Sequence, residues 1–428
     1  SQQRTKGLKP NAAAPPVCRR LVWGRNPTPS PLTAQPGSAA CLLYVLTRMQ
    51  QVVVAGAGIL GCSTGLHLAR RGAKVCIVDP GGSNATKASW AWLNASKKQP
   101  QSYKDLNMAG MAEWAASFPH LVQPKGSVLL DDASPSTDEN YPCEALTAEA
   151  LAEAEPALSA PELQGRALHR YAQEAWVDPQ RACASMLEEA RSLGAQLLLS
   201  DHLDELIVET DGARATAGDD GGGGNISPRV LGARTACGLT LEADCVVLTC
   251  GVGAPALAAA AGVGLPLAHK PARIATTTAL PPGTLGCMLC SPDVFVVQRP
   301  DGSFLLGSPA ESTDEGVTPA FGRSLLAAAE KLLPALRDVQ LVSVQVAYRP
   351  YPVDGHPLVG FAADGLYVCV THSGMTLGPH LGRLVAGEVA SQGRHLAPEL
   401  SVFRPDRAFG ADSAYGWHAV TAAPVRTT

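Results

Sequence analysis

A strand, a glycine-rich turn, a helix and a second strand follow one another over residues 51–79, and no other feature constrains the fold as strongly. The stretch reads QVVVAGAGILGCSTGLHLARRGAKVCIVD. Gly56, Gly58 and Gly61 form a GxGxxG pattern between strand and helix, which lets the backbone approach a pyrophosphate at a positive helix end. Asp79 ends the second strand, where a carboxylate can accept from ribose hydroxyls. The unit predicts a Rossmann-type dinucleotide site; the alternative is a turn that only packs helix on strand.

Length and charge narrow the class of protein. With 428 residues the chain is long enough for two or three structural domains. Its formal net charge of -4 comes from mixed, scattered charges, whereas a nucleic-acid-binding protein usually carries a basic stripe or interleaved aromatic residues. Nucleic acid is therefore not expected as a partner.

The N-terminal segment differs from the rest in charge. Residues 1–78 contain no Asp or Glu, and Asp79 is the first acidic residue. Residues 1–48 combine basic residues with Pro, Ser, Thr and Ala and show no clear periodicity, which is typical of an organellar transit peptide. We expect a chloroplast or mitochondrial location on this ground. The alternatives are a disordered tail, or upstream sequence that is not translated if Met49 is the true start.

Neither long apolar run predicts a membrane span. Residues 52–60 are interrupted by glycines, and residues 251–268 contain Pro255 and Pro266. The twelve cysteines are dispersed, as expected for free thiols in a reducing compartment.

One cysteine pair, Cys287 and Cys290, has CxxC spacing. A zinc site would need a second pair or nearby histidines at ligand spacing. We therefore expect these two to be loop cysteines and predict no metal site.

The remaining chain alternates helical and strand patterns. Residues 101–160 show helical spacing around a strand at 126–130, and Gly221–Gly224 lie in a flexible insertion. Asp178 and Pro179 predict the start of a helix, and Asp301–Gly302 predicts a hairpin turn. Strands are expected at 195–199, 203–208, 234–239, 244–249, 294–298 and 339–348, and helices at 180–193 and 324–333. The later strands suggest a mostly antiparallel sheet, the usual wall of a substrate pocket.

Six separated segments occur in the order found in the D-amino acid oxidase family of FAD enzymes, which includes glycine oxidase, sarcosine oxidase and D-amino acid dehydrogenase. The first is the strand–turn–helix unit already described. The others read ATKASWAWLNA, ADCVVLTCGVGA, VVQRPDGSFLLG, YRPYPVDGHPLVG and GLYVCVTHSGMTLGPHLGRLVAGEVA. The chain resembles this family over about residues 51–392. The resemblance implies an FAD-binding domain of Rossmann type interleaved with an antiparallel-sheet substrate domain, in the α/β (mixed α+β) class.

The resemblance also implies which residues contact the cofactor. Thr86 and Ser89 supply hydroxyls close to the second strand, Gly251 lies at the carboxyl end of a buried strand, and Ser373 precedes a helix whose positive end can stabilise an anionic reduced ring. Simple alternatives are core packing for Trp90 and Trp92 and helix capping for Ser373. The full set of expected cofactor contacts is Gly56, Gly58, Ile59, Leu60, Gly61, Asp79, Pro80, Thr86, Ser89, Trp92, Leu93, Val208, Thr249, Gly251, Gly355, Ser373, Gly374, Met375, Thr376 and Leu377.

Arg349 and His372 are the expected substrate contacts. Arg349 follows a long apolar strand and precedes Pro350, and its guanidinium suits an amino acid carboxylate, which the matching arginine binds in the family. The alternative is a structural ion pair, for instance with Asp354. The chain departs from glycine oxidase where His372 replaces a second carboxylate arginine and Phe295 replaces a pocket tyrosine. A weaker anion site and a more apolar wall favour a bulkier or secondary amine over glycine.

The predicted FAD domain comprises residues 49–100, 165–255 and 350–395, the substrate domain residues 101–164 and 256–349, and a C-terminal tail residues 396–428. The resemblance implies hydride transfer from the substrate carbon to flavin N5, giving an imine that water hydrolyses. FAD is expected to be noncovalent, and oxygen or a quinone to accept its electrons. Two alternatives remain: a flavin-binding assembly or scaffold protein, and an NAD-dependent dehydrogenase, which shares the first motif.

Overall fold

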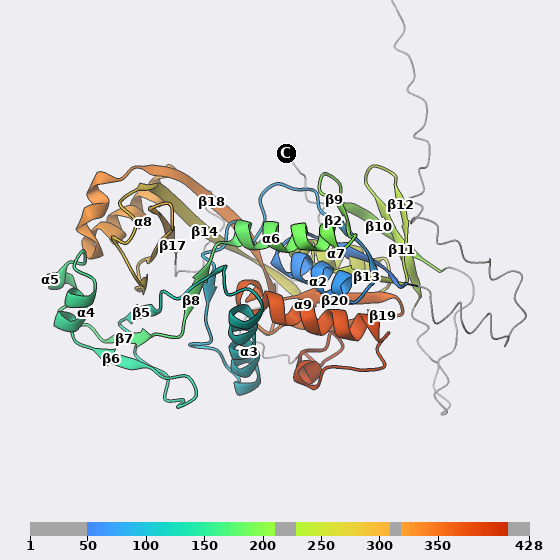
Figure 1. Cartoon of the computed structure of the whole chain (residues 1–428), viewed down its shortest axis with the longest axis horizontal. Helices are drawn as coiled ribbons and strands as arrows, with labels where there is room; N and C mark the ends of the chain where they lie inside the picture. The colour runs from blue at the N-terminus through green and yellow to red at the C-terminus, as the bar shows by residue number, and fades with distance from the viewer. Residues whose placement is uncertain (1–48, 210–227, 309–317, 410–428) are drawn as a thin grey trace, which may run out of the picture.

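Two large sheets of different character lie at opposite ends of the molecule (Figure 1). The structure is a computed structural model that describes residues 49–209, 228–308 and 318–409. The predicted transit peptide, the glycine run at 221–224 and most of the predicted C-terminal tail lie outside these residues.

The first sheet contains the predicted strand–turn–helix–strand unit. It has six strands in the order β19-β20-β13-β1-β2-β9, all parallel to their neighbours except β19. The strands are β1 (Gln51–Ala55), β2 (Lys74–Val78), β9 (Gln196–Leu198), β13 (Cys245–Leu248), β19 (Leu358–Ala363) and β20 (Leu366–Val370). The apolar side chains of the four inner strands, β1, β2, β13 and β20, are buried on both faces, as parallel sheets require.

Helices cover one face of this sheet and a small sheet covers the other. Helix α2 (Ile59–Arg70) packs between α6 (Pro179–Ser192) and α9 (Gly374–Ala390). Glycines allow α2 and α9 to approach, because a Cβ on Gly378 would lie 2.7 Å from Ile59 and one on Gly382 would lie 2.1 Å from Ser63. On the opposite face, α7 (Ala254–Ala259) and the antiparallel sheet of β10 (Leu203–Val208), β11 (Val230–Thr235) and β12 (Thr240–Glu242) complete a second core layer.

The second large sheet is mainly antiparallel, as predicted. Its order is β18-β14-β17-β16-β15-β5-β7-β6, with one parallel pairing between β15 and β5. The strands are β5 (Ser127–Leu130), β6 (Glu144–Leu146), β7 (Leu168–Tyr171), β14 (Leu267–Ala279), β15 (Met288–Cys290), β16 (Phe295–Gln298), β17 (Ser303–Gly307) and β18 (Leu341–Pro352). Helices α4 (Ala148–Ala154), α5 (Ala160–Leu163) and α8 (Pro319–Leu332) lie at this end.

Short elements connect the two sheets. Strands β3 (Trp92–Leu93), β4 (Val122–Gln123) and β8 (Ala175–Val177) form a three-stranded sheet, and α3 (Gln101–Ser117) packs on α9. The described part of the chain also contains the short 3-10 helices η2 (Gly251–Gly253), η3 (Pro334–Asp338) and η4 (Pro398–Phe403). The longest pairing, β14 with β18, begins beside η2 and runs outward to α8.

Several local predictions are confirmed. Helix α6 begins at Pro179, and the Asp178 carboxylate accepts from Gln180 N and Arg181 N at 2.9 Å. The hairpin turn at Asp301–Gly302 separates β16 from β17, with Gly302 at φ +84°.

Other predictions are wrong in detail. The strand expected at residues 234–239 spans the turn between β11 and β12, because the backbone reverses there and Gly238 takes φ +81°. Cys290 is not a loop cysteine, because it ends β15, whereas Cys287 lies in the loop before that strand as expected; both are buried. Strand β7 falls within the range assigned to the FAD domain but pairs in the eight-stranded sheet.

Within the described ranges, no helix combines the length and the apolar character that a membrane span requires. The same residues contain no group of three or more His, Cys, Asp or Glu side chains that could hold a metal ion.

Candidate active site

The glycine turn after β1 is closed so tightly that side chains are excluded. Gly56 takes φ +98°, donates its N–H to Val78 O at 2.7 Å, and would place a Cβ 2.9 Å from the Cα of Cys250. A Cβ on Gly61 would lie 1.8 Å from the Gly56 carbonyl oxygen. The close approach of β1, α2 and β13 therefore requires glycine at both positions.

The N-terminus of α2 has the properties of an anion site. Gly58 is the N-cap and supplies no side chain, and the first turn carries no acidic residue. Ile59 N donates to the Thr86 hydroxyl at 3.1 Å. Exposed N–H groups and a positive helix end suit a pyrophosphate, so this turn fits a dinucleotide.

The Asp79 carboxylate fixes the edge of the same turn. Its two oxygens accept from Ala57 N and Gly81 N, each at 2.7 Å. An ionised carboxylate has about four acceptor positions, so two backbone bonds leave capacity for ribose hydroxyls.

A second helix N-terminus, that of α9, is joined to the segment around Trp92. The Thr376 hydroxyl donates to Trp92 O at 3.1 Å and accepts from Asn94 N at 3.3 Å. Pro379 lies inside α9 and has no N–H for the carbonyl of Met375. The Trp114 indole of α3 donates to that carbonyl at 2.7 Å, so the first turn of α9 is anchored from outside the helix.

Both helix ends open into one cavity of about 870 Å³, a size typical of cofactor and substrate sites. Its wall includes most of the residues expected from the sequence. These are Gly56, Gly58, Ile59, Leu60, Asp79, Pro80, Thr86, Ser89, Trp92, Thr249, Gly251, Arg349, His372, Ser373, Gly374, Met375 and Thr376. Residues separated by nearly 300 positions in the sequence, such as Gly56 and Arg349, therefore share one chamber.

Five expected contacts do not line this cavity. Leu93 and Leu377 are buried in the core, and Gly61 packs against the Gly56 carbonyl. Val208 ends β10 and packs on the core below the small sheet, and Gly355 forms a turn at φ +79° beside Tyr351. These five residues lie behind the cavity lining and are not exposed to the cavity.

One wall of the cavity is strongly cationic. Arg349 on β18 is paired in register with Lys270 on β14, whose ammonium lies 4.2 Å from the centre of the Tyr351 ring. Arg349 Nη1 lies 3.4 Å from His372 Nε2, and Lys98 also lines the cavity. This wall suits a carboxylate.

His372 contributes no charge to that wall. Burial and the neighbouring cations Lys98, Arg349 and Lys270 lower its pKa to about 3, so the imidazole is neutral near pH 7. Its ring packs on Tyr351 with centroids 4.9 Å apart. His372 therefore offers a neutral polar edge beside the Arg349 guanidinium.

Another part of the cavity wall is aromatic. Trp90 packs on Trp92 with centroids 5.6 Å apart, and Phe295 lies 5.4 Å from Trp90 and 6.1 Å from Trp92. The Trp92 indole donates to the Glu174 carboxyl at 2.7 Å. Burial raises the pKa of Glu174, although bonds from Ser127, Ser96, Tyr141 and Trp92 work in the other direction.

Sequence reasoning missed Lys98, Lys270 and Glu174. Lys98 is the only one of the three with a local signal, because it lies three residues beyond the ATKASWAWLNA segment, which ends at Ala95. Lys270 and Glu174 reach the site through strand pairing and a buried hydrogen bond. Neither is visible in the spacing of residues along the chain.

Comparisons with known proteins agree with this geometry. Residues 51–388 match the family described as FAD dependent oxidoreductase, DAO. The chain is 28% identical over 364 residues to a glycine oxidase of Pseudomonas aeruginosa, covering 79% of this chain and 94% of that protein. It is 24% identical over 397 residues to a glycine oxidase of Geobacillus kaustophilus, covering 85% and 99%.

Solved structures share the fold. The glycine oxidase of Geobacillus kaustophilus superposes with a TM-score of 0.69 at 22% identity, covering 85% of this chain and 100% of that chain. An L-proline dehydrogenase from P. horikoshii gives a TM-score of 0.69 at 19% identity, covering 84% and 97%. Family and fold together favour FAD over the NAD alternative, and the chain belongs to the DAO family of FAD-dependent oxidoreductases.

Proposed function

We propose that this enzyme oxidises the C–N bond of an amine or amino acid that carries a carboxylate. The observation that carries the proposal is the shared cavity, in which the glycine turn of β1 opens toward the cationic wall of Arg349. Relatives are named glycine oxidase, and solved structures of this fold include an L-proline dehydrogenase and an iminodiacetate oxidase.

The chain's own residues bind and orient. Gly56, Gly58 and the N-terminus of α2 would hold the pyrophosphate, Asp79 the ribose, and the N-terminus of α9 the flavin ring. FAD, when bound, supplies the acceptor for a hydride from the substrate carbon. Arg349 holds the carboxylate, which fixes the carbon relative to the ring and removes much of the entropic cost of the reaction.

The walls favour a secondary or bulkier amine over glycine. His372 is neutral beside Arg349, so the carboxylate is bound by fewer charges than a second arginine would supply. Trp90, Trp92 and Phe295 present apolar surface that a substituent on nitrogen or Cα can cover. An N-alkyl amino acid fits both walls.

FAD is bound noncovalently in this proposal. Cys250 lines the cavity, but its Cα lies against Gly56 at the pyrophosphate turn, and burial raises the pKa of its thiol to about 12. A thiol held neutral beside the phosphates is a poor candidate for a ring linkage. Acid precipitation should leave the flavin in the supernatant; flavin in the pellet would contradict noncovalent binding.

We further propose that oxygen or a quinone accepts the electrons. Parallel turnover assays under air and under argon with a soluble quinone would distinguish the two acceptors.

We also propose an organellar location, which the acid-free N-terminal segment supports. Imaging of a fluorescent fusion to residues 1–48 tests it.

Anaerobic bleaching of the flavin tests the central proposal. The purified yellow protein is mixed with glycine, N-methylglycine, N-ethylglycine, proline enantiomers and iminodiacetate, and absorbance in the blue band is followed. Bleaching by N-alkyl amino acids, faster than by glycine, is expected. If no member of a broad amine panel reduces the flavin, the enzyme does not act on this class of substrate.

A further inference from the structure

Lys98 projects into the cavity from the segment after β3. It lines the wall together with Arg349 and His372. Its ammonium donates to the Ser373 hydroxyl at 3.2 Å and lies 5.9 Å from the centre of the Tyr103 ring. Ser373 is the N-cap residue of α9, and its hydroxyl bonds the Tyr103 hydroxyl at 2.7 Å and does not cap the helix. Lys98 is therefore held at the helix end that the flavin ring would occupy.

The backbone before Lys98 is in an unusual conformation that aims the side chain inward. Lys97 takes φ +59°, a left-handed conformation that costs a non-glycine residue about 1 kcal/mol or more and persists only where neighbours hold it. The Lys97 ammonium is held outward by the Asp132 carboxylate and the Ser134 carbonyl. Consecutive lysines thus point in different directions, one to the surface and one into the cavity.

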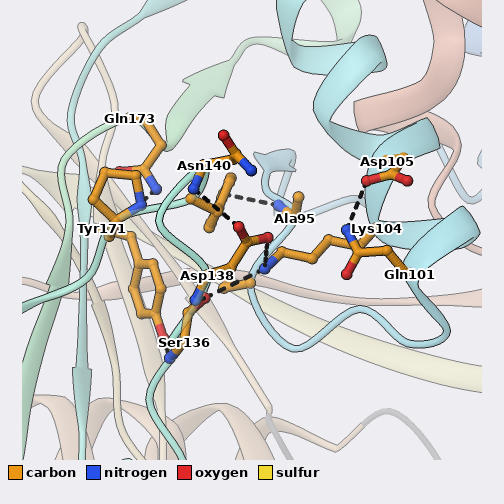
Figure 2. A network of polar contacts seen from close by, with 12 residues as sticks. Ala95, Gln101, Lys104, Asp105, Ser136, Asp138, Asn140, Tyr171 and Gln173 are labelled. Carbon is orange, nitrogen blue, oxygen red and sulfur yellow. Dashed lines mark hydrogen bonds and ion pairs between the residues drawn. The ribbon is translucent and has the colours of Figure 1, made fainter.

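The segment that holds Lys97 is itself anchored at several points. Figure 2 shows Lys104 of α3 reaching Asp138, with an ion-pair distance of 2.6 Å, and Ser136 N donating to the Tyr171 hydroxyl at 3.0 Å. Tyr141 closes the segment by accepting from Ala95 N at 2.9 Å and donating to Glu174 at 2.7 Å. Residues 131–141 therefore form a fixed brace beside the lysine pair.

Burial makes Lys98 easier to deprotonate than an ordinary lysine. Burial lowers its pKa to about 8, and the more distant Glu174 carboxyl acts in the opposite direction. The groups that face the same space from neighbouring elements are Tyr103 of α3, His372 and Ser373 before α9, Arg349 of β18, Lys270 of β14 and Glu174 before β8.

Amine oxidation needs a group that can take a proton. An amino acid in solution carries an ammonium, and hydride can leave its carbon only when a lone pair on nitrogen stabilises the product iminium. His372 cannot serve, because the same cations disfavour its protonated form. Among the cavity-lining residues on this wall, Lys98 alone has an ionisable side-chain nitrogen with a pKa close to neutral pH.

We propose that Lys98 is the base that deprotonates the substrate ammonium, with Lys97 as its positioning residue. The proposal rests on the amine-oxidising function proposed above. In this step the N–H bond of the substrate ammonium breaks, its proton joins the lone pair of the neutral Lys98 amine, and the substrate nitrogen keeps the electron pair. Net charge is unchanged, and Arg349 meanwhile binds the carboxylate.

The test compares two amines of nearly the same shape and different basicity. N-ethylglycine is an ammonium at pH 7, whereas N-(2,2,2-trifluoroethyl)glycine is largely neutral; the same two substituents are placed on whichever amino acid of the panel bleaches the flavin fastest. Lys98→Met should slow anaerobic flavin reduction about 100-fold for the ethyl compound, a typical effect of losing a general base. The trifluoroethyl compound is already a neutral amine and needs no base, so its rate of flavin reduction should fall by less than about threefold.

Lys98→Arg separates a base from a carboxylate-binding cation. Arginine keeps the positive charge but cannot release a proton near pH 8, so it should be as slow as Lys98→Met on the ethyl compound. Recovery of the rate by arginine, or equal losses on both amines, overturns the assignment. Lys331→Met, an exposed position on α8, serves as the matched control and should change neither rate.

A second readout does not depend on turnover. Trace labelling of the FAD-bound protein with acetic anhydride across a pH series, followed by peptide mass spectrometry, gives the midpoint at which each lysine becomes nucleophilic. Lys98 should react with a midpoint near 8, well below the value of about 10.4 for an ordinary lysine. In Lys97→Ala, which loses the outward ion pair, the midpoint should move toward the ordinary value; an ordinary midpoint in the wild type overturns the proposal.

The outcomes distinguish this proposal from the one it rests on. If no amine bleaches the wild-type flavin, the amine-oxidising function fails and the base assignment with it. If the wild-type flavin is bleached and Lys98→Met slows flavin reduction equally for both amines, only the base assignment fails. Bound-flavin absorbance and near-ultraviolet circular dichroism establish that each variant is folded.

Discussion

The glycine turn and the cationic wall form two sides of one cavity, yet they are built in different ways. The turn is made by residues within one stretch, from Gly56 to Asp79, and its geometry follows from glycines that nothing else could replace. The wall draws Lys98, Arg349 and His372 from three segments, and Lys270 pairs with Arg349 from a fourth. Local backbone sterics determine the first side, and long-range pairing determines the second.

This difference should appear most strongly at Gly61. In Gly61→Val the new Cβ would start 1.8 Å from the Gly56 carbonyl, so we expect loss of bound FAD and a fall in unfolding free energy of about 3 kcal/mol, as in overpacked cores. Flavin content and urea denaturation measure both. Gly264→Ala is the control, because nothing lies within 4 Å of its added Cβ; a wild-type flavin content in Gly61→Val would show that the turn can relax.

Arg349 tests the other side of the comparison. Arg349→Ala should lower kcat/KM for a carboxylate substrate about 10³-fold, since removing one partner of a buried charge contact costs about 2–5 kcal/mol. FAD content should stay at the wild-type level, because the turn is built elsewhere. Arg349→Lys keeps the positive charge but lacks the two-pronged guanidinium, so it should recover part of the lost kcat/KM. An unchanged reduction rate by every carboxylate substrate in Arg349→Ala would remove the carboxylate assignment.

A pH-dependent contact joins the loop after β18 to the segment that follows Lys98. The Asp354 carboxylate accepts from Arg407 at 2.8 and 2.9 Å, and His356 bonds Gln99 O at 3.1 Å. The hydrogen bond to Asp354, opposed by burial, raises the pKa of His356. The stability that His356 supplies is therefore complete below its unfolded pKa of about 6.5 and is lost as pH rises through the higher folded value.

Replacing Asp354 should remove that pH dependence. Burial opposes ionisation of Asp354, but bonds from His356 and Arg407 outweigh it and hold its pKa well below its usual range. We expect Asp354→Asn to lose about 1–2 kcal/mol of unfolding free energy at pH 6, less than for a fully buried pair, and a smaller amount at pH 9. Thermal unfolding at both values measures this. His356→Gln should flatten the profile similarly, and equal losses at both pH values would contradict the linkage.

Phe295 should give the smallest effect. Phe295→Tyr adds one hydroxyl to the aromatic wall beside Trp90 and should shift the ratio of kcat/KM for N-ethylglycine to glycine by about threefold to tenfold in favour of glycine, the scale of a single contact in an apolar pocket. Phe295→Leu removes the ring without adding a polar group and controls for packing. A shift in the opposite direction would show that this wall does not select against small substrates.

The sequence predicts the local side of this comparison well and the other side poorly. Asp178 and Pro179 predict a helix start because capping depends on adjacent residues. Residues 234–239 have strand composition but span a turn, since the pairing of β11 with β12 decides where the backbone reverses. Leu93 and Leu377 lie in the right segments but face the core, because side-chain direction at a segment end depends on packing.

Buried polar contacts are the hardest part to predict. Glu174 belongs to no recognisable motif, yet its carboxyl holds Trp92 in the aromatic wall. Lys97 and Lys98 are adjacent and chemically identical in the sequence, and only the left-handed backbone at Lys97 separates their roles. Such distinctions arise from contacts between distant segments and leave no periodic signal.

The long pairing of β14 with β18 has a mechanical consequence. It runs in register from Leu267 opposite Pro352 to Thr276 opposite Ser343, a span of roughly 30 Å. Arg349 and Lys270 both lie on this strand pair, whereas His372 follows β20 of the other large sheet. A shift of one sheet relative to the other would therefore move Arg349 and Lys270 together and alter the contact between Arg349 and His372.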